Sequence, residues 1–367
     1  MLLASLAALA PMVALQSRDL DARPFPRVGM LWSPYNGPGA LWDKAGNYAL
    51  VLIGTDGLGL RFKANANADM ATEIDAAGVA KAKATIAKFY KEHPDSQVIV
   101  ETYFFEANEG TYPADSPWWF RDDKGQKVSF WKGCYNMATD NPGYIKHIAK
   151  RIDAIAEATE GKTGLYLDNL RFDDRAKKGW MELLGLLRKS RPDRFIMANA
   201  GWDSDGLAWV LPQLNGIMYE DSVHHTADGD QEKFYARVAH HDSLMRKPTR
   251  SMVEIFGKDS DVESAWRELV RTLLYTDAGF LYADSTFGHR HAWRKEWSPL
   301  LGKAVDGHRT PNGQAQTRRF ANGMVAWNPS RVSVTLELGG VYRDQRTQAT
   351  VKKVTLSPGQ GAYLVKE

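Results

Sequence analysis

Short apolar runs alternate with longer segments whose apolar residues recur at a helical period, and the alternation repeats eight times. Runs of four to eight residues are too short for helices and are typical of buried strands. We expect strands at residues 28–32, 49–53, 97–103, 164–167, 195–198, 216–219, 251–256 and 279–283. Helices are predicted at 76–93, 144–160, 177–189, 205–211, 231–244 and 262–275, while the first connection, 33–48, is too short for a good helix. The chain is therefore predicted to contain repeated β-α units.

Each predicted strand becomes polar at or near its C-terminal end. The residues at these ends are Ser33, Thr55, Asp56, Glu101, Thr102, Asp168, Asn169, Asn199, Glu220, Asp221, Glu254 and Asp284. A doubly wound sheet also alternates strands and helices, but it does not usually reach eight units with a polar residue at every exit. About 250 residues are typical of an eight-stranded α/β barrel, so residues 24–305 are long enough for one. The predicted fold class is therefore α/β, a (β/α)8 TIM barrel.

The pattern changes after the barrel. Residues 314–367 contain short alternating apolar runs separated by turn signals, with no helical period. We expect these residues to form a small C-terminal antiparallel β-domain, sandwich-like, packed on the barrel.

The chain begins with an apolar stretch at residues 2–15, which has the length of a signal-peptide core and is too short to cross a bilayer. It lacks the usual basic residues, so a misassigned start or an apolar leading helix is the alternative. We interpret residues 1–17 as a signal peptide or apolar leader and expect a secreted or periplasmic protein. No later stretch reaches 18 uncharged apolar residues, so no membrane contact is expected for the mature chain.

Charge and cysteine content exclude several classes. The 47 Lys and Arg residues nearly balance the 44 Asp and Glu residues, and no basic run suggests a nucleic-acid track. The single cysteine, Cys134, excludes an intrachain disulfide framework. The glycines at 54, 57 and 59 follow a strand but are not in dinucleotide-binding order, so no nucleotide cofactor is expected.

Two strand ends carry the chemistry that the sequence predicts. Alternation along a strand places Tyr166 and Asp168 on one face of the fourth strand, and Met218 and Glu220 on one face of the sixth. Catalytic residues of such barrels lie where the strands end, so both carboxylates are expected over one substrate. Paired carboxylates carry out glycoside hydrolysis, and the sequence leaves open both the ~5 Å separation of retaining enzymes and the ~6.5–9.5 Å separation of inverting ones.

Each carboxylate also has a structural interpretation. An acidic strand end often caps the next helix or pairs with an arginine, and Arg171 and Arg175 follow Asp168 closely. Asp221, next to Glu220, is a second possible cap. Two carboxylates with Asn199 on the strand between them favour a functional site.

The order of elements and three short motifs resemble a known group of barrel glycosidases. The motifs are the Tyr-Leu-Asp-Asn strand end at 166–169, the Tyr-Glu-Asp strand end at 219–221 and the Arg-Phe-x-Asn-Gly-x-Val-x-x-Asn-Pro segment at 319–329. They resemble the hypothetical glycosyl hydrolase family 15, and more distantly the chain is similar to endo-α-1,4-polygalactosaminidases and α-galactosidases. The resemblance implies that Asp168 is the nucleophile and Glu220 the acid/base. Loops after the first three strands match no family with a known sugar, so the substrate stays open.

A two-carboxylate mechanism requires different environments for the two groups. We expect Glu220 to be protonated in a drier environment beside Tyr219 or Met218. Asp168 should stay ionised through hydrogen bonds from Asn169, Asn199 or Arg171.

Aromatic and acidic residues at the strand exits are candidates for sugar binding. The chain has 12 Trp and 14 Tyr, and aromatic rings stack on sugar faces, although they also fill cores. The segment 106–141 has no clear helix and is predicted to form a substrate-binding flap, with Trp118 and Trp119 as its best candidates. The predicted substrate-binding residues are Trp32, Asp56, Glu101, Tyr103, Trp118, Trp119, Asn169, Arg171, Asn199, Trp202, Glu254 and Asp284. Asp173 is a further acidic candidate, and each acidic residue has a helix cap or ion pair as its alternative role.

Two other functions remain as alternatives. A metal-dependent hydrolase is suggested by the histidines at 224–225, 240–241, 289 and 291. The pair at 240–241 lies in a predicted helix rather than at a strand end, and 289 and 291 follow the eighth strand, so no metal is expected. A carbohydrate-binding or polysaccharide-assembly protein would keep the barrel without the chemistry. The paired carboxylates favour a glycosidase acting on a carbohydrate.

Overall fold

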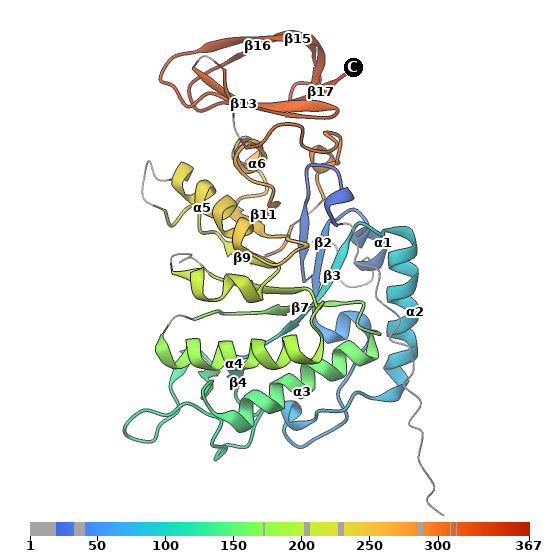
Figure 1. The fold of residues 1–367 in the computed structure, drawn as a ribbon, viewed down its shortest axis with the longest axis vertical. Helices are drawn as coiled ribbons and strands as arrows, with labels where there is room; N and C mark the ends of the chain where they lie inside the picture. Colours follow the sequence, from blue (N-terminus) through green and yellow to red (C-terminus); the bar gives the residue numbers. More distant parts are fainter. Residues whose placement is uncertain are drawn as a thin grey trace, which may run out of the picture.

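The computed structural model describes residues 20–32, 41–171, 173–201, 206–226, 231–284, 289–291, 293–308, 310–312 and 314–367. Two parts are seen in Figure 1: a barrel of strands surrounded by helices, and an antiparallel sheet formed by the C-terminal residues. The predicted signal peptide, Ser33 and Trp202 lie outside the described residues. No helix among the described residues is long and apolar enough to cross a membrane.

Eight parallel strands form the barrel, in the order in which they occur along the chain. They are β1 (Gly29–Leu31), β2 (Leu50–Ile53), β3 (Gln97–Thr102), β7 (Gly164–Leu167), β8 (Ile196–Asn199), β9 (Gly216–Glu220), β10 (Met252–Gly257) and β11 (Gly279–Asp284). Val28, just before β1, pairs in parallel with Phe280 of β11, and the Phe280 backbone N–H donates to the Arg27 carbonyl over 2.7 Å. This contact brings the first strand to the eighth, so the predicted eight-stranded barrel is confirmed.

Helices cover the outside of the barrel. They are α1 (Leu41–Ala45), α2 (Ala76–Glu92), α3 (Pro142–Ala158), α4 (Asp174–Ser190), α5 (Gln231–Leu244) and α6 (Val262–Tyr275), with short 3-10 turns η1 (Leu20–Ala22), η3 (Thr55–Leu58), η4 (Ala68–Met70), η5 (Leu207–Trp209), η6 (Leu211–Gln213) and η8 (Lys295–Trp297). The helix predicted at 205–211 is wrong: the described part of that segment forms η5 and the start of η6. Pro212 lies in η6, where its missing N–H prevents a longer helix.

Side-chain caps explain where the main helices begin. The Asn141 side chain accepts hydrogen bonds from the backbone N–H groups of Gly143 and Tyr144, and Pro142 occupies the first turn of α3. Asp173 caps α4 in the same way, through the N–H of Ala176. Asp173 is therefore a helix cap, the structural alternative considered for it. These caps fix the positions at which the loops from the barrel mouth enter the helices.

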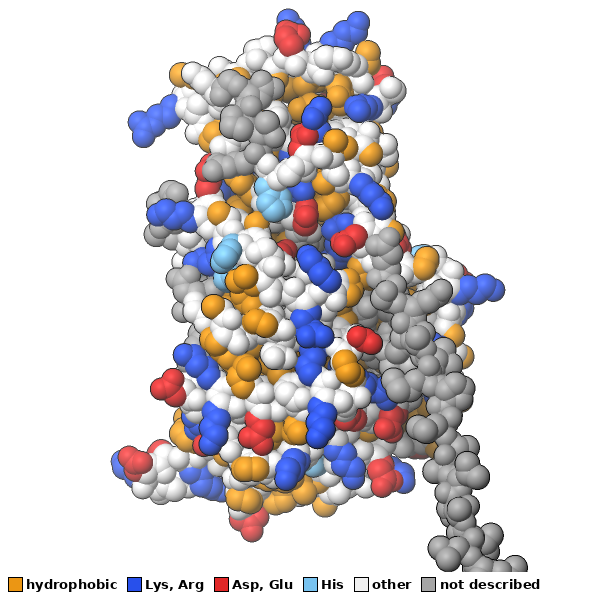
Figure 2. Space-filling model, in the orientation of Figure 1, with side chains coloured by type: hydrophobic (Ala, Val, Ile, Leu, Met, Phe, Trp, Pro, Cys, Tyr) orange, Lys and Arg blue, Asp and Glu red, His pale blue; other side chains and the backbone are white. Residues whose placement is uncertain are grey.

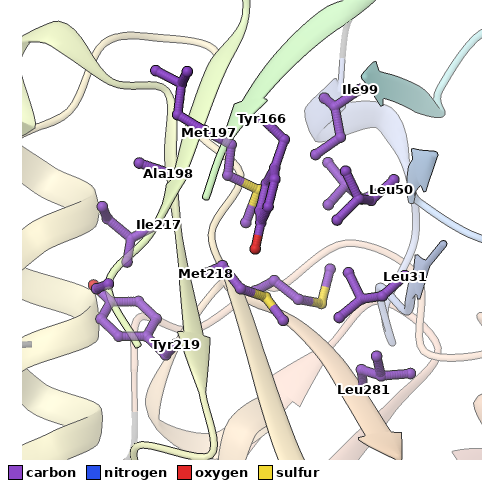
Figure 3. Close-up of a cluster of buried hydrophobic side chains, with 14 of the residues drawn as sticks. Leu31, Leu50, Ile99, Tyr166, Met197, Ala198, Ile217, Met218, Tyr219 and Leu281 are labelled. Atoms are coloured by element: carbon purple, nitrogen blue, oxygen red, sulfur yellow. The ribbon is translucent and has the colours of Figure 1, made fainter. Parts of the chain in front are cut away.

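The barrel interior is filled with side chains, as Figure 3 shows for Leu31, Leu50, Tyr166 and Met218. Tyr219 lies on the other side of its strand, where its hydroxyl is 2.9 Å from His241 Nδ1 of α5. The alternation predicted for β7 and β9 is therefore confirmed, and it directs Asp168 and Glu220 to the inner side of the barrel mouth.

The C-terminal residues form a six-stranded antiparallel sheet in the order β12-β13-β14-β17-β15-β16. The strands are β12 (Thr310–Asn312), β13 (Ala315–Phe320), β14 (Gly323–Trp327), β15 (Val334–Asp344), β16 (Thr350–Leu356) and β17 (Gly361–Lys366). The sheet packs on α6, where the rings of Trp266 and Tyr363 lie 5.9 Å apart. Tyr363 and Trp327 belong to the same buried cluster as the barrel core, whereas Met324, Leu336 and Leu364 belong to a second buried cluster within the sheet.

Candidate active site

Three strand exits adopt an uncommon backbone conformation. Trp32 after β1, Asn169 after β7 and Asp221 after β9 have φ angles of 54°, 51° and 51°. Residues other than glycine rarely adopt positive φ, and such residues cluster at functional sites. The conformation marks the mouth of the barrel around β1, β7 and β9 as the candidate site.

The amide of Asn199 joins the two predicted catalytic carboxylates. Its Nδ2 donates to Asp168 Oδ1 over 2.9 Å and to Glu220 Oε2 over 2.7 Å. The two accepting oxygens therefore lie within about 5.6 Å of each other, the sum of those distances. The structure thus brings together three residues that the sequence placed on strands four, five and six.

Asn169 makes a second bridge from the same carboxylate. Its Nδ2 donates to Asp168 Oδ2 over 3.0 Å and to Glu106 Oε1 over 2.5 Å. Hydrogen bonds from Asn169 and Asn199 favour the ionised form of Asp168, as predicted. Burial is the larger influence and raises the pKa of Asp168 above its usual range. Arg171 lies over the ring of Phe130 at 4.7 Å, and its charge acts on Glu106.

Glu106 is a site residue that the sequence analysis missed. It lies at the start of β4 (Glu106–Asn108), just beyond the end of strand β3, and is almost completely buried. Burial and the nearby Asp168 raise the pKa of Glu106 to about 8. The signal in the sequence was weak, because Glu106 stands four residues past a strand that already ends in Glu101.

Glu220, Asp168 and Glu106 differ in how far their side chains are exposed to solvent. Its side chain is 23% exposed, whereas Asp168 and Glu106 are buried. The drier environment predicted for Glu220 is therefore wrong, and Tyr219 faces α5 rather than the site. Glu220 is instead the carboxyl group that a molecule entering the barrel mouth reaches most easily.

Glu101 and Trp32 form a further pair at the mouth. Trp32 Nε1 donates to Glu101 Oε2 over 2.8 Å. Burial raises the pKa of Glu101 to about 7, with the nearby Asp168 adding to the effect. Tyr103, two residues later, is 43% exposed and is available for contact with a ligand.

Glu254, at the level of Glu220 in the next strand, is fully buried on β10. Both of its carboxylate oxygens lie 2.9 Å from Nδ1 of His289. Nε2 of the same ring is 3.7 Å from Glu220 Oε1. His289 is thus a second site residue that the sequence analysis did not select, although the histidines at 289 and 291 had drawn attention to this segment.

Asp221 serves as a structural clamp between β9 and β10. Its backbone N–H donates to the Glu254 carbonyl, and its Oδ1 accepts from the Phe256 backbone N–H over 2.8 Å. His224 Nδ1 lies 2.7 Å from the same oxygen. Asp221 is therefore occupied by these contacts, which leaves Glu220 as the accessible acid of this strand exit.

Two further predicted acidic residues lie away from the bridged carboxylates. Asp56 is exposed on the η3 turn after β2. Asp284 is buried at the exit of β11 and accepts a hydrogen bond from the Asp259 backbone N–H.

The segment 106–141 forms the three-stranded sheet β4-β6-β5, completed by β5 (Ser129–Trp131) and β6 (Cys134–Asn136). Trp119 is only 2% exposed and packs inside this flap, with Lys127 4.4 Å from its ring. Trp118 packs against His147 of α3, at 4.7 Å between ring centroids. These two tryptophans therefore hold the flap in place in this structure. Trp131, at 47% exposure, presents its ring to solvent instead.

The described histidines do not converge on a metal site. Among the residues that the structure describes, no group of three or more His, Cys, Asp or Glu side chains is placed to hold a metal ion. His241 contacts Tyr219, and His291 is buried against the ring of Tyr48 at 5.6 Å. Acidic and basic side chains are mixed over the face shown in Figure 2, in keeping with the near-balanced charge of the sequence.

No family model matches the sequence, and no curated protein matches it. The fold, in contrast, is similar to those of several solved structures. An α-amylase from Lactobacillus plantarum has a TM-score of 0.58 at 13% identity, covering 95% of this chain and 99% of that one. The cyclic α-maltosyl-(1→6)-maltose hydrolase from Arthrobacter globiformis has a TM-score of 0.59 at 14% identity, with coverage of 95% and 99%.

The α-amylase from Geobacillus thermoleovorans, complexed with acarbose, has a TM-score of 0.55 at 11% identity and coverage of 96% and 100%. These neighbours are α-amylase-type glycoside hydrolases, and at such identity the similarity establishes the fold alone. The resemblance to the hypothetical glycosyl hydrolase family 15 stays a prediction.

Proposed function

We propose that the protein is a glycoside hydrolase that cleaves a poly- or oligosaccharide, with Asp168 as nucleophile and Glu220 as acid/base. The observation that carries the proposal is the Asn199 amide, which donates one hydrogen bond to each carboxyl group. The pair lies at a barrel mouth, where such folds carry their chemistry. The similarity of the fold to α-amylases supports the reaction class.

The reaction proceeds in two steps. In the first, the Asp168 carboxylate attacks the anomeric carbon, the glycosidic C–O bond breaks, and Glu220 gives its proton to the departing oxygen. In the second, Glu220 takes a proton from water, the water oxygen attacks the anomeric carbon, and the ester to Asp168 breaks. Asn199 holds both carboxyl groups in register through the two steps.

The test is an assay for released reducing ends over a panel of glycans and aryl glycosides. Maltooligosaccharides and cyclic α-maltosyl-(1→6)-maltose come first, because one structural neighbour is a cyclic α-maltosyl-(1→6)-maltose hydrolase, and bacterial exopolysaccharides follow. Asp168→Asn and Glu220→Gln should each lower kcat by at least about 100-fold, because each removes a group that reacts directly.

Asp174→Asn is the matched control, because it makes the same change at a fully exposed side chain of α4. It should keep wild-type kcat, and all variants should keep the wild-type circular dichroism spectrum. Glycan binding without turnover by the wild-type protein would instead indicate a non-catalytic carbohydrate-binding protein. Near-normal turnover by either active-site variant would refute the assignment.

The distance between the carboxyl groups also predicts the stereochemistry. Retaining enzymes hold them at about 5–5.5 Å and inverting ones at about 6.5–9.5 Å. The limit of about 5.6 Å that Asn199 sets between one oxygen of Asp168 and one oxygen of Glu220 favours the retaining arrangement. Proton NMR of the first-formed product should show the anomer of the substrate, and initial formation of the opposite anomer would exclude Asp168 as nucleophile.

A further inference from the structure

Glu254 is placed where it cannot meet a substrate. Its side chain is fully buried on β10, and both carboxylate oxygens are taken up by Nδ1 of His289. The sequence analysis made it a candidate substrate ligand. Its burial leaves His289 as the only group in this pair that faces the barrel mouth, with a side chain 24% exposed.

The His289 ring is held on both sides. The centroid of Trp32 lies 4.3 Å from it and that of Phe256 lies 5.4 Å away. Trp32 is itself tied to Glu101 and has the positive φ angle noted above. The ring is therefore constrained, so that one nitrogen faces Glu254 and the other faces Glu220.

Charges around the ring favour the imidazolium form. Glu254, Glu220 and Asp168 act on it from β10, β9 and β7, and Glu101 faces it from β3. His291, two residues further along the same segment, also interacts electrostatically with it. Burial opposes the charge, but the carboxylates outweigh it and raise the pKa of His289.

We propose that His289 is a positioning residue that orients Glu220 and favours its carboxylate form after proton transfer, and that Glu254 acts only by holding His289. The inference rests on the proposed function and deepens it. Asn199 holds one oxygen of Glu220, and His289 lies 3.7 Å from the other. That distance is longer than a hydrogen bond, and catalytic contacts of this kind commonly shorten when substrate binds.

The first test separates this role from a merely structural one through the leaving group. An aryl glycoside with a strongly acidic phenol as leaving group needs no proton, whereas a poor leaving group depends on Glu220. His289→Gln and Glu254→Gln should each lower kcat about tenfold or more for poor leaving groups, and less than about threefold for good ones. The double variant should be no slower than the slower single variant, because the two residues act as one unit.

The pH profile provides a second kinetic readout. When the imidazolium beside Glu220 is lost, the carboxylate form of Glu220 becomes less favourable. The alkaline limb of kcat should therefore move to higher pH in both His289→Gln and Glu254→Gln. His224→Gln is the matched control, because His224 lies at the same mouth but contacts Asp221. Equal losses for all leaving groups, with an unmoved alkaline limb, would overturn the proposal.

Titration of His289 by NMR tests whether His289 and Glu220 interact, and it requires no enzymatic turnover. The midpoint should fall in Glu254→Gln and also in Glu220→Gln, because each change removes a neighbouring negative charge. An unchanged midpoint in Glu220→Gln would overturn the inference even in an active enzyme. If the wild-type protein hydrolyses nothing, the proposed function fails, while the titration still shows whether His289 and Glu220 are coupled.

Discussion

Asp168 stands at the centre of a chain of hydrogen bonds that runs from Glu106 through Asn169, Asp168 and Asn199 to Glu220. Each amide donates both of its protons, one to Asp168 and one to a flanking carboxyl group. The two flanking groups differ in surroundings, because Glu106 is buried and Glu220 is partly exposed. Access to substrate therefore favours Glu220 as the acid/base, and Glu106 as a neutral group that supports Asn169.

The role of Glu106 can be tested by two substitutions. With a pKa of about 8, Glu106 is protonated at pH 6, so Glu106→Gln should keep kcat/KM within about threefold. Glu106→Ala removes the acceptor of a buried hydrogen bond, which costs about 1–3 kcal/mol and should release Asn169 from its position. Melting temperature and kcat/KM, both measured at pH 6, distinguish the near-normal Gln variant expected here from the destabilised Ala variant. A Gln variant as inactive as Glu220→Gln would make Glu106 the proton donor.

The flap formed by β4, β5 and β6 is held at its base by α4. Arg175 donates to the Met137 carbonyl over 2.9 Å. Gly179 allows the closest approach, since a Cβ atom there would lie 2.0 Å from the Thr139 carbonyl oxygen. Trp118 and Trp119 complete the packing, so the flap is a firm part of the barrel mouth. Its exposed ring, Trp131, contacts Phe130, which lies beneath Arg171.

We propose that the flap binds substrate through Trp131. Trp131→Ala should raise KM for a polymeric substrate by about two- to twelvefold, because loss of a stacking aromatic costs about 0.5–1.5 kcal/mol. KM for a short aryl glycoside should stay unchanged, which makes that substrate an internal control. Val332→Ala, at an exposed apolar residue between β14 and β15, is a second control. Unchanged polymer KM in Trp131→Ala would show that the flap has no binding role of this kind.

The whole molecule contains several carboxyl groups that burial makes hard to ionise. The pKa values of Glu101, Asp242 and Glu254 are raised to about 7, and that of Glu106 to about 8. A group with a raised folded pKa binds its proton more tightly in the native than in the unfolded chain. Its contribution to stability is therefore present at low pH and is lost as pH rises toward the folded value.

The free energy of unfolding should consequently fall between pH 6.5 and 8. His291, whose pKa is lowered to about 4, acts in the opposite direction, but only a small part of its effect remains above pH 6.5, where the unfolded side chain is already half deprotonated. Calorimetry should show a lower melting temperature at pH 8 than at pH 6.5. Glu106→Gln should reduce the difference, because the amide does not ionise. An equal or higher melting temperature at pH 8 would contradict this assignment of buried groups.

The sequence by itself determined the barrel, because the buried strands and amphipathic helices leave periodic patterns that do not depend on distant contacts. The limits of α5 and α6 and all eight strands were predictable to within about two residues. At 205–211 the apolar period misled the prediction, because the described part of that segment forms η5 and the start of η6 rather than one helix. Asp168, Asn199 and Glu220 were also predictable, since parallel strands bring their C-terminal ends to one face.

Only the tertiary structure decided which groups surround Asp168 and Glu220 and which side chains are exposed to a substrate. Burial of Glu254 and Glu106, the approach of His289 to Glu220, and the packing of Trp118 and Trp119 all depend on loops from different parts of the chain. Local sequence carries no signal for such contacts, because a loop's path is set by what it packs against. The strand pattern therefore placed the carboxylates, and the loop packing defined their environments.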